Sequence, residues 1–198
     1  MPEKPDLTAL LGSRICHDLI SPIGAIGNGV ELLMMDGLAK GPEIALISES
    51  VAHANARIRF FRVAFGTSGG DQRIARSEVT AILSDMGRGG RLGIDWHSDT
   101  DLSRRDIKLL FLLIQCLESA LPYGGRIAVE QGPARWTLTA ASHKIRVDQP
   151  LWEVLSDPAA PAEIGAGQVH FALAAQEFRR QHRRLTVHLH DTGIAMEF

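Results

Sequence analysis

An apolar stripe in the first third of the chain restricts the folds open to it more than any other feature. Its members recur at spacings of three and four: Leu11, Ile15, Leu19, Ile23, Ile26, Val30 and Leu33. This is the period of one helix face, so the stripe predicts a long amphipathic helix. Asp6 or Thr8 can cap it, and it should run to about Met35. It ends at a connector with two glycines and a proline, residues 36–42.

A second stripe follows the connector with the same alternation of threes and fours: Ile44, Ile47, Val51, Ala54, Ile58, Phe61 and Phe65. Two long helices with a short connector predict a hairpin. One hairpin leaves much of both stripes uncovered, so we predict that two chains pair their hairpins in a dimeric four-helix bundle. The alternative is a hairpin that packs on the second half of its own chain.

His17 is predicted to lie on the solvent-facing side of the first helix. It stands two residues from both Ile15 and Leu19, about 200° around the helix at ~100° per residue. The residues that share its face are polar or small, namely Arg14, Ser21, Gly24 and Asn28. The sequence therefore predicts an exposed imidazole on an uncluttered surface.

The neighbours of His17 favour chemistry on its ring. Asp18 can orient or deprotonate the imidazole, and Arg14 can hold an anion one turn away. Pro22 removes the helix hydrogen bond to the Asp18 carbonyl and should kink the helix there. Glycines at 24, 27 and 29 weaken the helix further, which predicts a surface that a partner approaches closely.

The run His17-Asp18-Leu19-Ile20-Ser21-Pro22 resembles the histidine, acid, two residues, Ser/Thr, proline box of histidine-kinase dimerisation domains. The wider run 13–22, with 28–33 after it, resembles the ChpT-type histidine phosphotransferases. In that family the matching histidine carries a phosphoryl group between aspartates of receiver domains. The resemblance implies that His17 and Asp18 are catalytic. It also implies that phosphoryl support and receiver docking fall to Arg14, Ser21, Pro22 and Asn28.

The same resemblance implies the partners and cofactors. Upstream stands the receiver domain of a hybrid histidine kinase, and downstream stand the receiver domains of response regulators. The chain itself is expected to hold no metal and no cofactor, because Mg²⁺ is supplied by the receiver.

Composition sets broad limits. The chain has 198 residues, 45% of them hydrophobic, and a net charge of −2, which argues against nucleic acid or an anionic membrane as partner. Cys16 and Cys116 are the only cysteines, so we expect free thiols and a cytoplasmic protein. The N-terminus lacks the pattern of a signal peptide, and the longest apolar run, 109–114, is too short for a membrane span.

A glycine-rich stretch, residues 66–71, predicts a linker between two domains, 1–66 and 72–198. Beyond it we predict helices over 77–86, 103–121, near Trp152 and over 168–184, with a capping box at Ser103 and Asp106. Strands are predicted over 91–97, 126–130, 136–141, 144–148, 185–190 and 194–198. The class is therefore α+β, and the second domain is an α/β sandwich with helices on one face of an antiparallel or mixed sheet.

The second domain resembles the ATP-binding domain of histidine kinases, in which a buried helix ends in a Pro-x-Gly-Gly turn, here residues 122–125. Leu112 and Cys116 stand where the kinases have two asparagines for magnesium and phosphates, and neither is a hard oxygen ligand. Residues 140–143 replace the adenine-binding Asp-x-Gly-x-Gly loop, and the second glycine loop survives only as 165–167. We expect a degenerate domain that does not bind ATP.

Four other patterns have simpler explanations. Asp191-Thr192-Gly193 should be a hairpin turn, and His188 with His190 a solvent-facing pair without a third metal ligand. The basic run 179–184 suits a helix C-terminus better than nucleic acid. His53 and Asn55 should be surface residues, although a partner on the bundle could touch them.

These observations predict a homodimeric histidine phosphotransferase of a multistep phosphorelay that takes a phosphoryl group on His17. Two alternatives remain. An ATP-dependent histidine kinase would require nucleotide binding, and a non-catalytic dimeric scaffold would never be labelled at His17.

Overall fold

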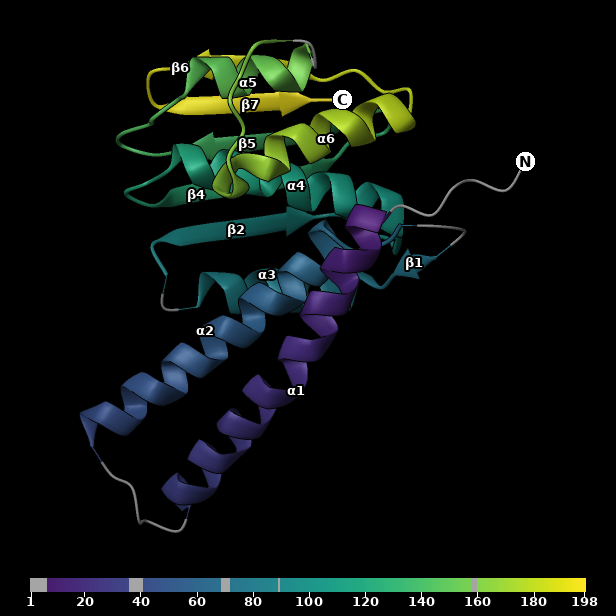
Figure 1. Cartoon of the computed structure of the whole chain (residues 1–198). Helices are drawn as coiled ribbons and strands as arrows, with labels where there is room; N and C mark the ends of the chain where they lie inside the picture. Colours follow the sequence, from purple (N-terminus) through teal and green to yellow (C-terminus); the bar gives the residue numbers. More distant parts are fainter. Residues whose placement is uncertain (1–6, 36–40, 69–71, 89, 158–159) are drawn as a thin grey trace.

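The computed structural model describes residues 7–35, 41–68, 72–88, 90–157 and 160–198. A hairpin of two helices, α1 (Leu7–Met35) and α2 (Pro42–Ala64), projects from a sheet covered by helices (Figure 1). Both helices match the predicted bounds closely. Thr8 lies inside α1 and so does not cap it, while Asp6 and residues 36–40 of the connector fall outside the described residues.

The second half of the chain, which we call the α/β part (residues 72–198), alternates helices and strands. Its elements are β1 (Arg73–Ile74), α3 (Arg76–Gly87), β2 (Leu92–His97), β3 (Leu102–Ser103), α4 (Arg104–Ala120), β4 (Gly125–Gln131), β5 (Trp136–Ala141), α5 (Gln149–Ser156), a 3₁₀ turn (Ala166–Gln168), α6 (Val169–Arg180), β6 (Thr186–His190) and β7 (Gly193–Glu197). The class is thus α+β, as predicted.

The main sheet has the strand order β2-β4-β5-β7-β6 and is mixed, because β2 and β4 are parallel and all other neighbours are antiparallel. Buried residues alternate with more exposed ones along its central strands, as Ile127 and Val129 do on β4. One face therefore lies on the core, where α4 is buried along most of its length. Ser103 caps α4 by accepting a hydrogen bond from the Asp106 backbone N–H at 3.1 Å, as predicted.

Two sequence predictions in the α/β part were wrong. Residues 144–148 do not form a strand, because no neighbouring strand pairs with them; Ile145 and Val147 instead lie against the core. Helix α6 ends at Arg180 and not near Arg184, because His182 adopts a left-handed conformation with φ of 52°. The predicted turn at residues 191–193 is confirmed by the pairing of His190 with Gly193.

The hairpin and the α/β part share one hydrophobic core. Phe60 near the end of α2 is fully buried and stacks on Phe111 of α4 with ring centroids 4.5 Å apart. The Arg57 guanidinium makes two hydrogen bonds to the Glu118 carboxylate, at 2.8 and 2.9 Å, and Arg59 bonds Asp85 at 2.8 Å. The base of α2 is therefore firmly attached to α3 and α4.

The apolar stripe of α1 divides between two faces. Ile23 and Val30 are partly or fully buried together with Cys16, Ile20 and Gly27, which belong to the face toward α2. At Gly27 a Cβ would stand 3.2 Å from Val51 of α2, which shows how closely the helices approach there. The other five members remain 44% to 60% exposed, namely Leu11, Ile15, Leu19, Ile26 and Leu33. Much of the predicted stripe therefore has no cover within one chain.

Candidate functional site

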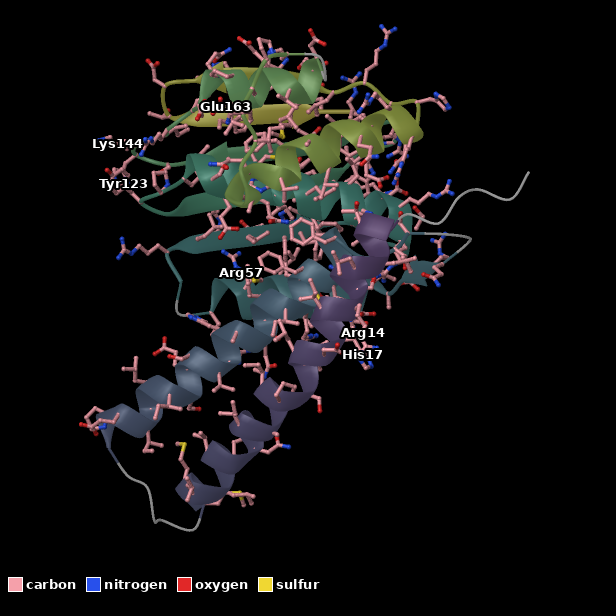
Figure 2. All side chains as sticks on the ribbon, viewed as in Figure 1. Arg14, His17, Arg57, Tyr123, Lys144 and Glu163 are labelled. Carbon is pink, nitrogen blue, oxygen red and sulfur yellow. The ribbon has the colours of Figure 1, made fainter. Side chains whose placement is uncertain are left out.

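His17 projects from α1 into solvent with 81% of its side chain exposed (Figure 2). Its Nδ1 lies 3.1 Å from Oδ1 of Asp18, and the second carboxylate oxygen of Asp18 accepts a hydrogen bond of 2.8 Å from Nε of Arg14. The three side chains thus form one chain of contacts along the exposed side of α1. The predicted outward orientation of His17 is confirmed.

The carboxylate determines which ring nitrogen is free. Its hydrogen bond with His17 lowers the pKa of Asp18, and Arg14 adds to this effect. An ionised carboxylate can only accept hydrogen bonds, so in neutral His17 the proton resides on Nδ1. Nε2 then carries a free lone pair and faces solvent, which is the arrangement of a nitrogen nucleophile.

The other predicted site residues divide between two faces. Ser21 is exposed one turn beyond His17 on the same face. Asn28 is also exposed on that face but stands eleven residues from His17, about 16 Å along the axis at ~1.5 Å per residue. Pro22 lies about 140° around the helix from His17, beside the exposed apolar stripe. Helix α1 continues through Pro22, which is exposed, and its part in receiver docking stays a prediction.

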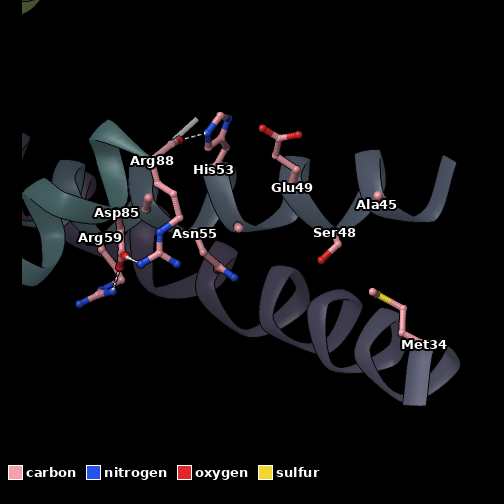
Figure 3. A pocket seen from close by; sticks show the side chains of 11 residues that line it. Met34, Ala45, Ser48, Glu49, His53, Asn55, Arg59, Asp85 and Arg88 are labelled. Carbon is pink, nitrogen blue, oxygen red and sulfur yellow. Dashed lines mark hydrogen bonds and ion pairs between the residues drawn. The ribbon is translucent and has the colours of Figure 1, made fainter. Parts of the chain in front are cut away.

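A groove of about 570 Å³ runs along α2 toward α3 (Figure 3). Small side chains such as Ala45, Ser48 and Ala52 form its floor, and Met34 reaches it from the end of α1. Asp85 closes one end by bonding both Arg59, at 2.8 Å, and Arg88, at 3.2 Å. His53 and Asn55 also line the groove, which the sequence could not indicate beyond their placement on the surface.

The groove and His17 lie on the same side of the hairpin. On α1, His17 follows the face toward α2 by about a quarter turn, and Ile15 precedes that face by about a third of a turn. On α2, Val51 faces α1. Ala52 follows Val51 by about 100° around the helix, and Ile47 precedes it by about 40°. Because the two helices run antiparallel, a rotation toward higher residue number around α1 and around α2 leads from their contact to the same side of the hairpin. One side of the hairpin therefore carries His17 and the groove, and the other carries the exposed apolar stripe.

The positions aligned with the magnesium ligands of kinases are closed to solvent. Leu112 and Cys116 are fully buried in α4, and burial raises the pKa of the Cys116 thiol well above its ordinary value. A buried neutral thiol and an alkyl chain do not bind Mg²⁺. Among the residues that the structure describes, no three His, Cys, Asp or Glu side chains gather as metal ligands would.

Comparisons with known proteins agree with this geometry. The family model for the histidine phosphotransferase C-terminal domain matches residues 76–193. Protein phosphotransferase ChpT of Brucella abortus (strain 2308) is 34% identical over 180 residues, which cover 87% of this chain and 86% of that protein. A solved bacterial phosphotransferase superposes with a TM-score of 0.70 at 29% identity, over 100% of this chain and 97% of the other.

An exposed histidine on a helical hairpin, joined to an α/β part, defines a protein of the phosphotransfer class. The chain belongs to the histidine phosphotransferase family, and it is a carrier of the phosphorelay type. Within the described part of the chain, no helix is long and apolar enough to cross a membrane.

Proposed function

We propose that His17 is the phosphoryl acceptor and that Nε2 is its reacting atom. The observation that carries this proposal is the contact between Nδ1 and Asp18, which leaves Nε2 free on a ring that is 81% exposed. The Nε2 lone pair attacks phosphorus in a receiver acyl phosphate, a P–N bond forms, and the P–O bond to the receiver aspartate breaks. The aspartate leaves as a carboxylate, and Asp18 stabilises the positive imidazole ring that results.

The reverse of this step transfers the group to a second receiver. Both donors and acceptors are receiver domains, which supply Mg²⁺ to neutralise the phosphoryl oxygens. We assign the upstream receiver to a hybrid histidine kinase and the downstream receivers to response regulators. All of them act in the cytoplasm.

A receiver docks on the side of the hairpin that carries His17. Ser21 and Asn28 present polar side chains there, and the groove offers a floor of alanine and serine with the ion pairs of Asp85 at one end. Such a surface admits close approach of a partner helix. Arg14 adds a positive charge beside the acceptor, which favours the approach of the acidic receiver site.

The opposite side of the hairpin forms the homodimer. Leu11, Ile15 and Ile26 are half exposed or more, and on α2 Ile47 is exposed on the same side. Contiguous apolar surface of this kind marks an interface in soluble proteins. Two copies related by a twofold axis bury both stripes in a four-helix bundle, and both copies of His17 remain outside.

The direct test replaces His17 with alanine. The side chain is 81% exposed and its contact with Asp18 is also exposed, so the variant should keep the melting temperature and the oligomeric state of the parent. Incubated with ³²P-labelled receiver domains and Mg²⁺, the parent should acquire label and the variant none. Label on His17→Ala would place the acceptor elsewhere. Absence of label on the parent with every receiver tested would favour the scaffold alternative.

A further inference from the structure

The segment Gly66–Ser68, predicted as the start of a flexible linker, is held along its length by one helix. Lys108 donates to the Gly66 carbonyl at 2.9 Å, Arg104 to the Thr67 carbonyl at 2.6 Å, and Arg105 to the Ser68 carbonyl at 3.4 Å. Successive carbonyls are thus bound by cations on the first two turns of α4. We call Gly66–Ser68 the strap.

The strap also holds the helix that carries His17. The Thr67 backbone N–H donates to Oγ of Ser13 on α1 at 3.3 Å. Ser13 precedes His17 by one turn, and its Oγ lies 3.2 Å from the position that a Cβ on Gly66 would occupy. That Cβ would also stand 2.2 Å from the Arg62 carbonyl oxygen, so only glycine fits at this point. The N-terminal turns of α1 therefore lie against the strap where the hairpin meets the α/β part (Figure 1).

A buried charge pair holds the strap from below. Lys108 is 4% exposed, and its Nζ lies 3.4 Å from the Glu177 carboxylate of α6, which is 5% exposed. Buried ion pairs often add little to stability compared with apolar side chains of similar volume. They do fix geometry, since a buried ammonium requires its partners at defined places. Here the partners are α6 and the Gly66 carbonyl.

The two helices of the hairpin differ in how they are attached. The base of α2 is fixed by Phe60 in the core and by the Arg57–Glu118 pair. Helix α1 packs along α2 and meets the strap at Ser13. We propose that Ser13, Lys108 and Glu177 are positioning residues: through the strap they fix the orientation of α1, and with it His17, relative to the α/β part. This role rests on the proposed function in so far as it concerns phosphotransfer.

The geometric claim is tested by distances between spin labels on Ala25→Cys in α1 and Thr139→Cys in β5, both exposed positions, with labelled chains diluted in unlabelled protein. The strap variant combines Ser13→Ala with Lys108→Met and Glu177→Met, so no single buried charge is left behind. Matched controls are Thr80→Ala, whose hydroxyl bonds only its own helix, and Lys144→Met, an exposed cation. We expect a narrow distribution in the parent and the controls and a broadened one in the strap variant.

The functional arm compares two phosphodonors. Phosphoramidate needs no docking surface, so it should label His17 equally fast in parent and strap variant. Transfer from a phosphorylated receiver depends on alignment and should fall about tenfold or more. An unchanged distance distribution, or broadening with unimpaired receiver transfer, would overturn the positioning role. Failure of the parent to accept label from any receiver would count against the proposed function. The distance distributions would still show whether the strap fixes the orientation of α1.

Discussion

Asp18 acts on His17 through proximity in sequence rather than through burial. The carboxylate is next to the histidine on the helix, and Arg14 one turn earlier restrains it by a second hydrogen bond. Both groups are exposed, so the pair adds little to the stability of the fold. The effect that we propose is on the ring, because a negative oxygen at Nδ1 favours the proton there and would leave Nε2 as the nucleophile.

Replacing Asp18 with asparagine should therefore impair acceptance without unfolding the protein. Transfer from a phosphorylated receiver should slow about 100-fold, in the range of a lost proton-orienting group. The ¹⁵N shifts of His17 should change from the Nδ1–H tautomer to a mixture. Asp191→Asn, in the exposed hairpin turn, is the matched control. Parental rates together with the parental tautomer in Asp18→Asn would show that the carboxylate has no such role.

The lowered pKa of Asp18 sets the pH range of this contact. Its folded-state value is depressed, so the stabilisation is present above the ordinary aspartate range and is lost only as pH falls through the depressed value. The carboxylate is therefore charged throughout the neutral range. Any change in transfer rate between pH 6 and 8 must therefore come from groups other than this carboxylate.

At this scale the sequence was sufficient for the exposure of His17 and for its contact with Asp18; the roles of both residues stay predictions. Helical spacing alone predicts that the ring faces solvent, and adjacency predicts contact with Asp18. The bond between Arg14 and Asp18 was not predicted, because spacing brings the two side chains together without fixing their rotamers. On an ideal helix Pro22 stands nearer the exposed apolar stripe than His17, and its assignment to receiver docking stays a prediction.

Helix α1 shows what periodicity can and cannot determine. Spacing predicted the helix, yet the helix has two adjacent apolar faces. Cys16, Ile20 and Gly27 lie toward α2, and Gly27 permits close approach there, while Ile15 and Ile26 stay exposed. Hydrophobicity alone cannot choose between such faces. The same limit affected α2, where Val51 contacts α1 inside the hairpin although it is spaced with the exposed Ile47.

Charges on the exposed stripe should dissociate the proposed dimer and preserve the fold of the chain. We expect Ile15→Asp with Ile26→Asp to be monomeric by multi-angle light scattering, with the circular dichroism of the parent. Leu32→Asp is the control, since Leu32 is 61% exposed but lies off the stripe. Val51→Asp should instead destabilise the hairpin itself, by about 2 kcal/mol or more, because its side chain packs on Gly27. A stable dimer of the double variant would place the interface elsewhere.

Helix α6 should make the α/β part sensitive to acid. His170 is buried, its Nε2 has no hydrogen-bond partner, and burial lowers its pKa from the ordinary 6.5. Below pH 6.5 the unfolded chain binds a proton at this site that the folded chain does not, so stability falls as pH drops from 6.5 toward the depressed value. Urea unfolding at pH 7 and pH 5.5 should show a smaller loss in His170→Gln than in the parent. His188→Gln is the control and should lose as much stability as the parent. A loss of stability in His170→Gln equal to that of the parent would contradict the prediction.

The elements missed by sequence analysis depend on partners distant along the chain. Residues 144–148 alternate like a strand, but a strand requires a neighbour to pair with, and spacing does not reveal one. Gly66–Ser68 has the composition of a linker, and only the fold shows that Arg104, Arg105 and Lys108 hold its carbonyls. Composition predicts that this segment is flexible by itself, but it does not reveal that cations from another part of the chain bind its carbonyls.

Across the whole molecule, the hairpin and the α/β part behave as one unit with separate tasks. The core continues from Phe60 of α2 into α4, so the α/β part supports the hairpin directly. The same helix α4 carries Leu112 and Cys116 at the positions aligned with the magnesium ligands of kinases. A helix that is buried along most of its length serves packing, and the chemistry is left to α1. Phosphoryl groups should therefore enter and leave only through receivers.

The last prediction concerns the labelled intermediate, and it follows from this division. The carboxylate beside the exposed imidazole is Asp18, whose oxygens already contact His17 and Arg14 and so are not placed to activate water. We therefore expect a phosphoryl group on His17 to persist. Calorimetry should show no saturable ATP binding at micromolar concentration, and the protein should not label itself with ATP. Labelled protein should be acid-labile and alkali-stable, as P–N bonds are. It should lose its label to an unphosphorylated receiver with Mg²⁺ and keep it with ADP, because transfer between two energetic bonds runs in either direction according to mass action. Alkali-labile label, or discharge by ADP, would show that His17 is not the carrier.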